Sequence, residues 1–195
     1  MPPAATDLAA QFLWAQELLD CACEALGDPA ISPYGCPDRA CVYNGGVDVA
    51  FEDCCLGQLW VSWGRTYPTM TFPSEMAGAD LVRACLANGS YLATDFEVGI
   101  IRCAPTMDSH GNPPSCEAIA DSALQMHYEA RVILRAVACC LQTWNSDNAR
   151  PRYGIWRDQV PAGDGGTCVG SVLRVTIAEP LCICFPGLEP TPLPQ

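Results

Sequence analysis

The sequence of 195 residues contains no lysine, so all ten of its basic side chains are arginines. They are outnumbered by 22 acidic residues, which gives a formal net charge of −12. Proteins that bind nucleic-acid phosphates carry basic patches or stripes on their surface. The charge balance therefore disfavours a phosphate-binding role and indicates an acidic, well-solvated surface.

Histidine is nearly absent as well, because the chain has only His110 and His127. Histidine is the most frequent general base in enzymes, and neither residue has a nucleophile nearby in the sequence. His110 falls in a polar loop, and His127 lies within a predicted helix. We therefore expect no enzyme activity, and we assign no catalytic, cofactor-binding or metal-ligating residue.

The sequence also lacks a long apolar run. The longest candidate, VILRAVACCLQ, is interrupted by Arg135 and is too short for a membrane span. The first residues, MPPAATDLAAQFLWAQ, lack the basic start and continuous apolar stretch of a secretory signal. We expect that the protein makes no membrane contact and that it is synthesised in a reducing cytoplasm.

Cysteine, in contrast, is abundant, with 14 residues in the chain. The six in the first third are spaced as C-x-C, C-x₄-C and C-C, and none of these is the C-x₂-C pair typical of structural zinc. In a reducing compartment most of these thiols would act as small buried hydrophobes. A zinc site and a disulfide between loop cysteines remain alternatives. The six residues are Cys21, Cys23, Cys36, Cys41, Cys54 and Cys55.

Helical spacing of apolar residues is clear near the amino terminus. Steps of four and three residues over residues 6 to 26 predict one apolar helix face, and Gly27 predicts the helix end. The following segment, GDPAISPYGCPDRAC, is rich in Gly and Pro and predicts a loop. The predicted face comprises Leu8, Phe12, Ala15, Leu19, Ala22 and Leu26.

Alternation of apolar and polar residues predicts strands in the middle of the chain. TMTFP predicts a short edge segment, since Pro73 cannot continue a central ladder, and SEMAGADLVRACLANGS predicts a short helix and a turn. A meander of antiparallel strands is the simplest arrangement. The strand faces are Val47, Val49 and Phe51 in VDVAFED, Leu59, Val61 and Trp63 in GQLWVSWGR, and Phe96, Val98 and Ile100 in LATDFEVGIIRC.

A long helix and a final strand pair are predicted in the second half. The polar loop APTMDSHGNPP leads to Ser115 as N-cap and Glu117 in the first turn. The strands YGIWRDQV and CVGSVLRVTIA follow the helix and are joined by the turn PAGDGGT. The apolar helix face comprises Ile119, Ala123, Met126, Ala130, Ile133, Val137, Cys140 and Trp144, and one face of the last strand comprises Val169, Ser171, Leu173, Val175 and Ile177.

These elements predict an α+β fold: a mostly antiparallel sheet, covered on one face by the N-terminal helix and the long helix. Residues 1–179 form one domain in this interpretation, since a chain of this length usually forms one domain with a substantial core. Residues 180–195 form a Pro-rich C-terminal tail that we expect to be extended.

Three stretches resemble the tail terminators of long-tailed actinobacterial phages, which are neck proteins at the head-proximal end of the siphophage tail. They are CVYNGGVDVAFEDCCLGQLWVSWGRTYPTMTFP, FEVGIIRCAPTMDSHGNPPSCEAIADSALQ and WRDQVPAGDGGTCVGSVLRVTI. The shared pattern is a Gly-Gln-Leu-Trp-Val strand before a Tyr-Pro turn, Arg-Cys-Ala-Pro before an Asp/Gly/Pro loop, and a Gly-Gly-Cys-x-Gly hairpin. The sequence departs from it at WRDQVPAGDGG, where the family pattern has a Trp-Thr-Pro-type turn.

The resemblance implies a tail-terminator-like fold and a structural virion protein assembled in the host cytoplasm. Its copies would form a ring, six-fold in the family pattern, that caps the tail tube and joins it to the head connector. The implied partners are further copies, the major tail protein and a head-to-tail stopper or connector. DNA would pass through an acidic lumen without specific binding. A stopper or connector protein of the neck is the nearer alternative, and a small cysteine-rich metal-binding module is the farther one.

Two exposed segments are the candidate docking surfaces for these partners. YPTMTF lies near a predicted sheet edge, where exposed strands can pair, and the loop from Ala104 to Pro114 projects far enough to reach a neighbour. Ordinary exposed loops are the alternative for both. The candidate interface residues are Tyr67, Thr69, Phe72, Asp108, His110, Asn112 and Asp164.

Overall fold

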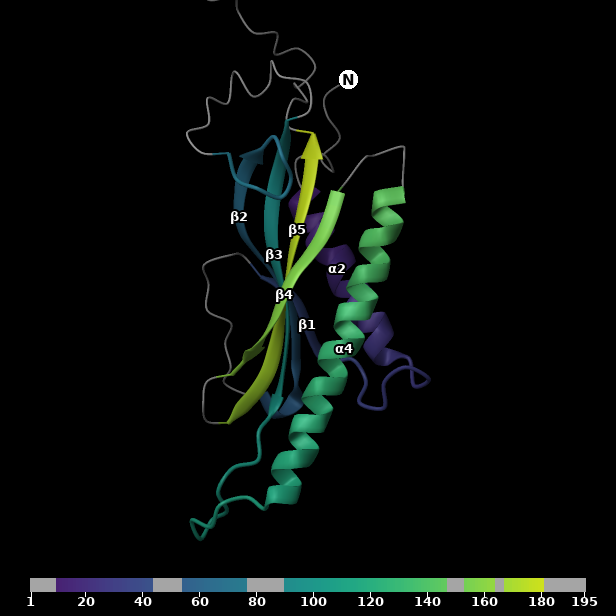
Figure 1. Ribbon diagram of the computed structural model, residues 1–195. Coiled ribbons are helices and arrows are strands. Elements are labelled where there is room, and N and C mark those ends of the chain that lie inside the picture. Colours follow the sequence, from purple (N-terminus) through teal and green to yellow (C-terminus); the bar gives the residue numbers. More distant parts are fainter. Residues whose placement is uncertain (1–9, 44–53, 77–89, 147–152, 164–166, 181–195) are drawn as a thin grey trace, which may run out of the picture.

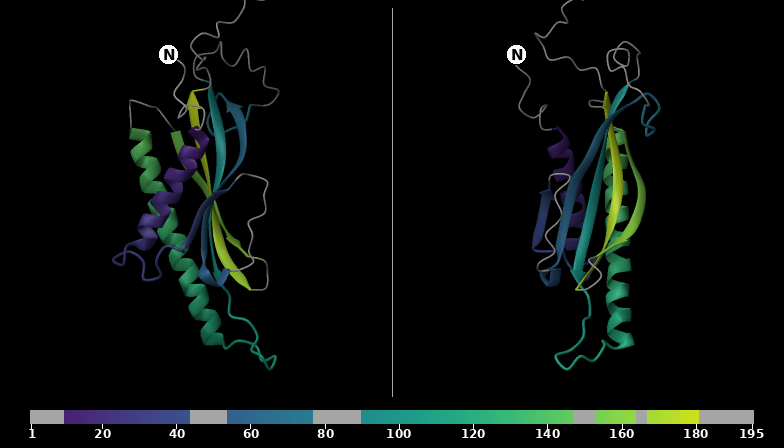
Figure 2. Two further views of the ribbon diagram at one scale, coloured as in Figure 1. Left: turned by 180° about the vertical axis from the view of Figure 1, so that it is seen from behind. Right: turned by 90° about the vertical axis from the view of Figure 1, so that its left-hand side faces the viewer.

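A computed structural model describes residues 10–43, 54–76, 90–146, 153–163 and 167–180. In this part of the chain a mixed five-stranded sheet packs against two helices, so the predicted α+β class is confirmed. The two helices lie on one face of the sheet (Figures 1 and 2). The elements are α2 (Ala10–Gly27), β1 (Arg39–Tyr43), the 3₁₀ turn η1 (Cys54–Leu56), β2 (Gln58–Thr69), β3 (Tyr91–Cys103), α4 (Cys116–Ser146), β4 (Tyr153–Ala162) and β5 (Cys168–Pro180).

The sheet order, β1-β2-β3-β5-β4, differs from a simple meander. β5 lies between β3 and β4, and both of these pairings are antiparallel. β1 begins within the segment 27–41 that was predicted to be a loop, and it pairs with β2 in parallel. The pairing gives Ala40 and Val42 a place against the core. That stabilisation comes from a distant partner, so the local Gly- and Pro-rich composition did not reveal the strand.

The buried stripe of α2 confirms most of the predicted helix face. Phe12 is the exception, because its side chain is 55% exposed. Trp14 takes the buried place instead and packs edge-on against Phe96, with 6.4 Å between ring centroids. Leu8 lies outside the described residues. The buried side chains of α2 are Trp14, Ala15, Leu18, Leu19, Ala22 and Leu26.

The N-cap predicted for the long helix is confirmed. The Ser115 hydroxyl accepts a hydrogen bond from the Ala118 amide at 3.1 Å, which satisfies one of the free N–H groups at a helix start. Met126, Ile133 and Val137 of the predicted face are buried, and Ala130, Cys140 and Trp144 are half-buried. Ile119 and Ala123, expected on the same face, are exposed, Ile119 by 50%. The first turns of α4 extend beyond the end of the sheet (Figure 1), so no core lies opposite Ile119.

The core lies between the helices and the sheet. The alternation predicted for β3 and for most of β5 is confirmed, because these residues are buried against the helix layer. Trp63 was expected to continue the β2 face, but it is exposed. Trp63 still pairs with the buried Phe96, and the register between β2 and β3 shifts between Trp63 and Thr66. The part of β2 that packs in the helix-covered core therefore ends next to this irregularity. The sheet residues of the core are Leu59, Val61, Phe96, Val98, Ile100, Leu173, Val175 and Ile177.

Some sequence predictions fall outside the described residues. These are the strand around Val47, Val49 and Phe51, most of the helix predicted after Pro73, and the tail beyond Pro180. Neither α2 nor α4 contains a stretch that is both long and apolar enough to span a membrane.

Candidate functional site

The segment around Tyr67 is less exposed than an interface would require. Tyr67 is only 4% exposed, and its hydroxyl donates to the Pro73 carbonyl at 3.0 Å. The Thr69 side chain is fully buried and donates to the Ser74 carbonyl at 2.6 Å. Phe72 is half-buried against the same cluster. These three candidate side chains therefore stabilise the turn from within, and Met70 is the exposed apolar residue of the segment.

Burial also affects the chemistry of Tyr67. It raises the pKa of the phenol, and the nearby carboxylate of Asp95 raises it further. Tyr67 therefore stays protonated and acts as a hydrogen-bond donor. This role agrees with its bond to the Pro73 carbonyl.

The loop between β3 and α4 projects from the end of the sheet (Figure 1). Asp108 organises it, because one carboxylate oxygen accepts the backbone amides of His110 at 2.8 Å and Asn112 at 2.9 Å. The other oxygen accepts the Asn112 side-chain amide at 2.8 Å. Gly111 has φ +82°, a conformation that favours glycine. The three candidate interface residues of this loop thus form one ordered, exposed turn, whereas Asp164 lies outside the described residues.

The hydrogen bonds to Asp108 also shift its titration. The side-chain amide of Asn112 contributes most, and the backbone amides of Asn112 and His110 add to it. Together they hold the pKa of Asp108 below its usual value. The carboxylate therefore stays charged, and the turn stays closed, at neutral pH.

A buried ion pair lies where this loop leaves β3. Glu129 of α4 is completely buried, and Arg102 of β3 donates to its carboxylate through Nη2 at 2.7 Å and Nε at 3.1 Å. Arg102 also donates to the Gly35 carbonyl at 2.8 Å. The guanidinium lies so close to Gly57 that a side chain there would collide with it. The pair therefore joins β3, α4 and the segment before β1, and it packs against Gly57 between η1 and β2.

Sequence reasoning missed this pair, although a signal was present. Glu129 lies between Met126 and Ile133 on the apolar face predicted for the long helix. A carboxylate at such a position requires a buried cationic or hydrogen-bonding partner. Arg102, at the end of a predicted apolar strand, was the sequence signal for that cationic partner.

Disulfides replace the isolated buried thiols that the sequence predicted. Seven described cysteines are disulfide-bonded, namely Cys168 and the six that form three bonds with one another, so the thiol prediction is wrong for them. Cys41, Cys116 and Cys139 are free, and no described group of three His, Cys, Asp or Glu side chains could hold a metal ion. The bonds join Cys21 of α2 to Cys140 of α4, Cys23 of α2 to Cys36, and Cys55 of η1 to Cys103 of β3.

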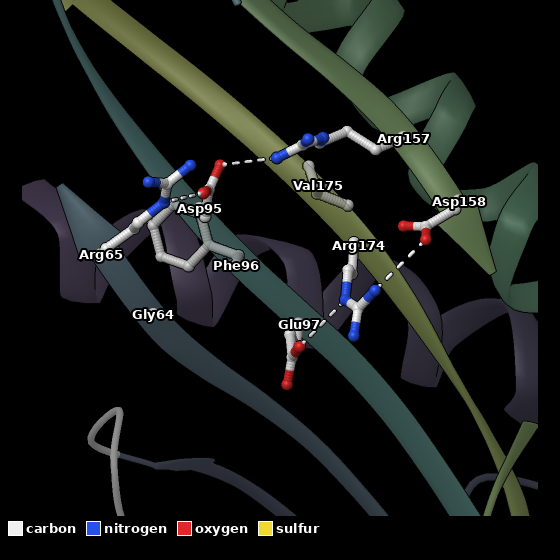
Figure 3. A pocket seen from close by; sticks show the side chains of 9 residues that line it. All are labelled: Gly64, Arg65, Asp95, Phe96, Glu97, Arg157, Asp158, Arg174 and Val175. Atoms are coloured by element: carbon white, nitrogen blue, oxygen red, sulfur yellow. Dashed lines mark hydrogen bonds and ion pairs between the residues drawn. The ribbon is translucent and has the colours of Figure 1, made fainter. Parts of the chain in front are cut away.

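The sheet face opposite the helices carries a network of charges around Asp95 (Figure 3). Its carboxylate pairs with Arg65 at 3.1 Å and Arg157 at 3.7 Å, and it accepts the Thr176 hydroxyl at 2.7 Å. Arg65 also pairs with Glu75 at 2.6 Å. Hydrogen bonds first to Asp95 and then to Glu75 raise the pKa of Arg65.

A second set of charges continues across the same face. Arg174 of β5 contacts Glu97 of β3 and Asp158 of β4, each at 3.2 Å (Figure 3). The two sets line a hollow of about 550 Å³. Because every arginine in the hollow already contacts a carboxylate, this face offers little uncompensated charge to an anion.

Comparison with known proteins identifies no family: no protein-family model matches the chain, and no curated protein matches it.

Proposed function

We propose that this protein is a structural subunit of a phage neck, a tail terminator that forms a ring on the head-proximal end of the tail tube. The sequence resemblance motivates the proposal, and a two-layer domain with an ordered projecting loop is compatible with it. In this proposal the ring also contacts a head-to-tail stopper or connector, and DNA passes through it without specific binding.

The observation that carries the proposal is the protruding end formed by the β3–α4 loop and the first turns of α4. Asp108 holds the loop in one conformation. Met107 beside it is 69% exposed, and Ile119 on α4 is also exposed. An ordered projection with apolar side chains is suited to docking, because little conformational entropy is lost on binding.

The charge balance supports free passage of DNA. With a net charge of −12, the protein would repel a duplex over the screening distance of the buffer. We expect no shift of duplex DNA in a gel at low salt. Tight, salt-sensitive binding would contradict the passage role.

The assembly itself is tested by light scattering and negative-stain imaging, alone and with tail tubes of a siphophage that carries this protein. We expect rings that bind tube ends. Met107→Asp should weaken binding to tube ends, because it places a charge in the docking surface. Met70→Asp, at the opposite end of the sheet, is the matched control.

Three outcomes distinguish the alternatives. Rings that bind the head connector but not tube ends would indicate a stopper. A persistent monomer that binds neither the head connector nor tube ends would contradict a neck function altogether. Equal binding by the Met107 and Met70 variants would contradict the docking role of the loop.

A further inference from the structure

The outer surface of α4 carries an apolar patch beside the segment that follows α2. Leu124 is 62% exposed, and Ile31, Tyr34 and Tyr128 are also exposed. The Tyr128 hydroxyl donates to the Ile31 carbonyl at 2.7 Å, and its ring lies edge-on to Tyr34 at 6.1 Å. These contacts hold the aromatic side chains in place, so the patch is preformed.

Positive charge borders this patch. Arg131 and Arg135 lie one helical turn apart on α4 and are exposed. Together with Ile31, Leu124 and Tyr128 they line a groove of about 720 Å³. Neither arginine forms an ion pair with another described residue, unlike the four sheet arginines Arg65, Arg102, Arg157 and Arg174. The groove is therefore a basic and apolar site on a strongly acidic protein.

The complementary surface is present on α2 of the same chain. Asp20 and Glu24 are exposed and, like the two arginines, are four residues apart. Leu13, about two helical turns before Asp20 on the same stripe, is an exposed apolar residue. A four-residue step spans about 6 Å along a helix, so the acidic pair and the basic pair have matching spacing.

We propose that the α4 groove of one copy binds the outer face of α2 of a second copy. Asp20 and Glu24 face Arg131 and Arg135 in this contact, and Leu13 adds apolar area. The contact joins two unlike surfaces and is therefore heterologous, which allows a ring to close. The inference rests on the proposed ring function and names the surfaces that build the ring.

Charge reversal tests the contact in the full-length chain. Light scattering compares the wild type with Arg131→Glu/Arg135→Glu, with Asp20→Arg/Glu24→Arg, and with all four changes together. Each reversal alone places like charges opposite one another, which is strongly unfavourable across an interface. We expect self-association to weaken by at least about tenfold in each double variant and to recover when all four changes are combined.

A matched control compares single reversals of exposed, unpaired arginines. Arg135→Glu should weaken assembly, and Arg39→Glu on β1 should not, although both change the net charge equally. Because these residues are exposed, thermal unfolding should remain close to that of the wild type. That measurement separates a lost contact from a lost fold.

The outcomes separate this inference from the proposed function. Rings that survive both reversals and still bind tube ends would overturn the α2–α4 contact and leave the terminator proposal intact. Assemblies that dissociate on reversal and recover with all four changes, but never bind tubes, would support the contact and overturn the terminator proposal. A wild-type protein that stays monomeric alone and with tubes would overturn both.

Discussion

Replacement of Glu129 by glutamine should strongly destabilise the fold. Glutamine keeps the size of the side chain but removes its charge. Arg102, whose side chain is only 14% exposed, then remains buried without a carboxylate partner, although it still donates to the Gly35 carbonyl. Removing one partner of a buried ion pair typically costs about 3–5 kcal/mol. That is a large part of the roughly 5–15 kcal/mol by which most domains are stable.

Equilibrium unfolding in urea, followed by tryptophan fluorescence, measures this cost. With a denaturant slope of about 2 kcal/mol per M, the midpoint should fall by about 1.5 M or more. Arg174→Gln is the control, because its pairs are about half-exposed and should be worth at most about 1 kcal/mol. Equal effects of the two variants would refute the assigned role of the buried pair. The double variant Arg102→Met/Glu129→Leu should recover much of the loss, because it removes both charges at similar volume.

Two further predictions concern a strand and the projecting loop. Gly99→Ala should lower the free energy of unfolding by about 1–3 kcal/mol, because the Trp60 ring covers the position that a methyl group would take. Gly64→Ala is the control, because the nearest atom to an added methyl group there is 3.4 Å away. In the same urea titration Gly64→Ala should be nearly neutral. The lowered pKa of Asp108 means that its stabilisation of the loop is complete above the unfolded-state pKa of about 3.9 and is lost as pH falls through the lower folded-state value. The backbone amide signals of the loop in NMR spectra should therefore change only below about pH 4, and Asp108→Asn should remove that transition.

Local signals predicted the helices and the long strands well. The Ser115 cap and the alternation of Phe96, Val98 and Ile100 depend on neighbours within a few residues, so the sequence displays them directly. Helix faces were accurate only where the sheet lies opposite. Ile119 keeps the helical spacing, but it lies past the end of the sheet, and spacing alone does not contain that information.

Features that depend on distant contacts were not predictable in the same way. β1 exists because it pairs with β2, and Arg102 with Glu129 connects residues 27 positions apart. The candidate interface illustrates the same limit. Composition suggested that Thr69 was exposed near a sheet edge, whereas a hydrogen bond to the Ser74 carbonyl holds its side chain inside the turn.

The central place of β5 has a consequence for the order of folding during synthesis. β5 pairs with β3 over its full length and also holds β4, yet it is the last described strand along the chain. Until residue 180 has left the ribosome, β3 lacks one neighbour and β4 has no strand to pair with. Such long-range pairing is slow to form. The sheet is therefore completed only after residue 180 has been synthesised, and surfaces that depend on the complete sheet cannot form before that point.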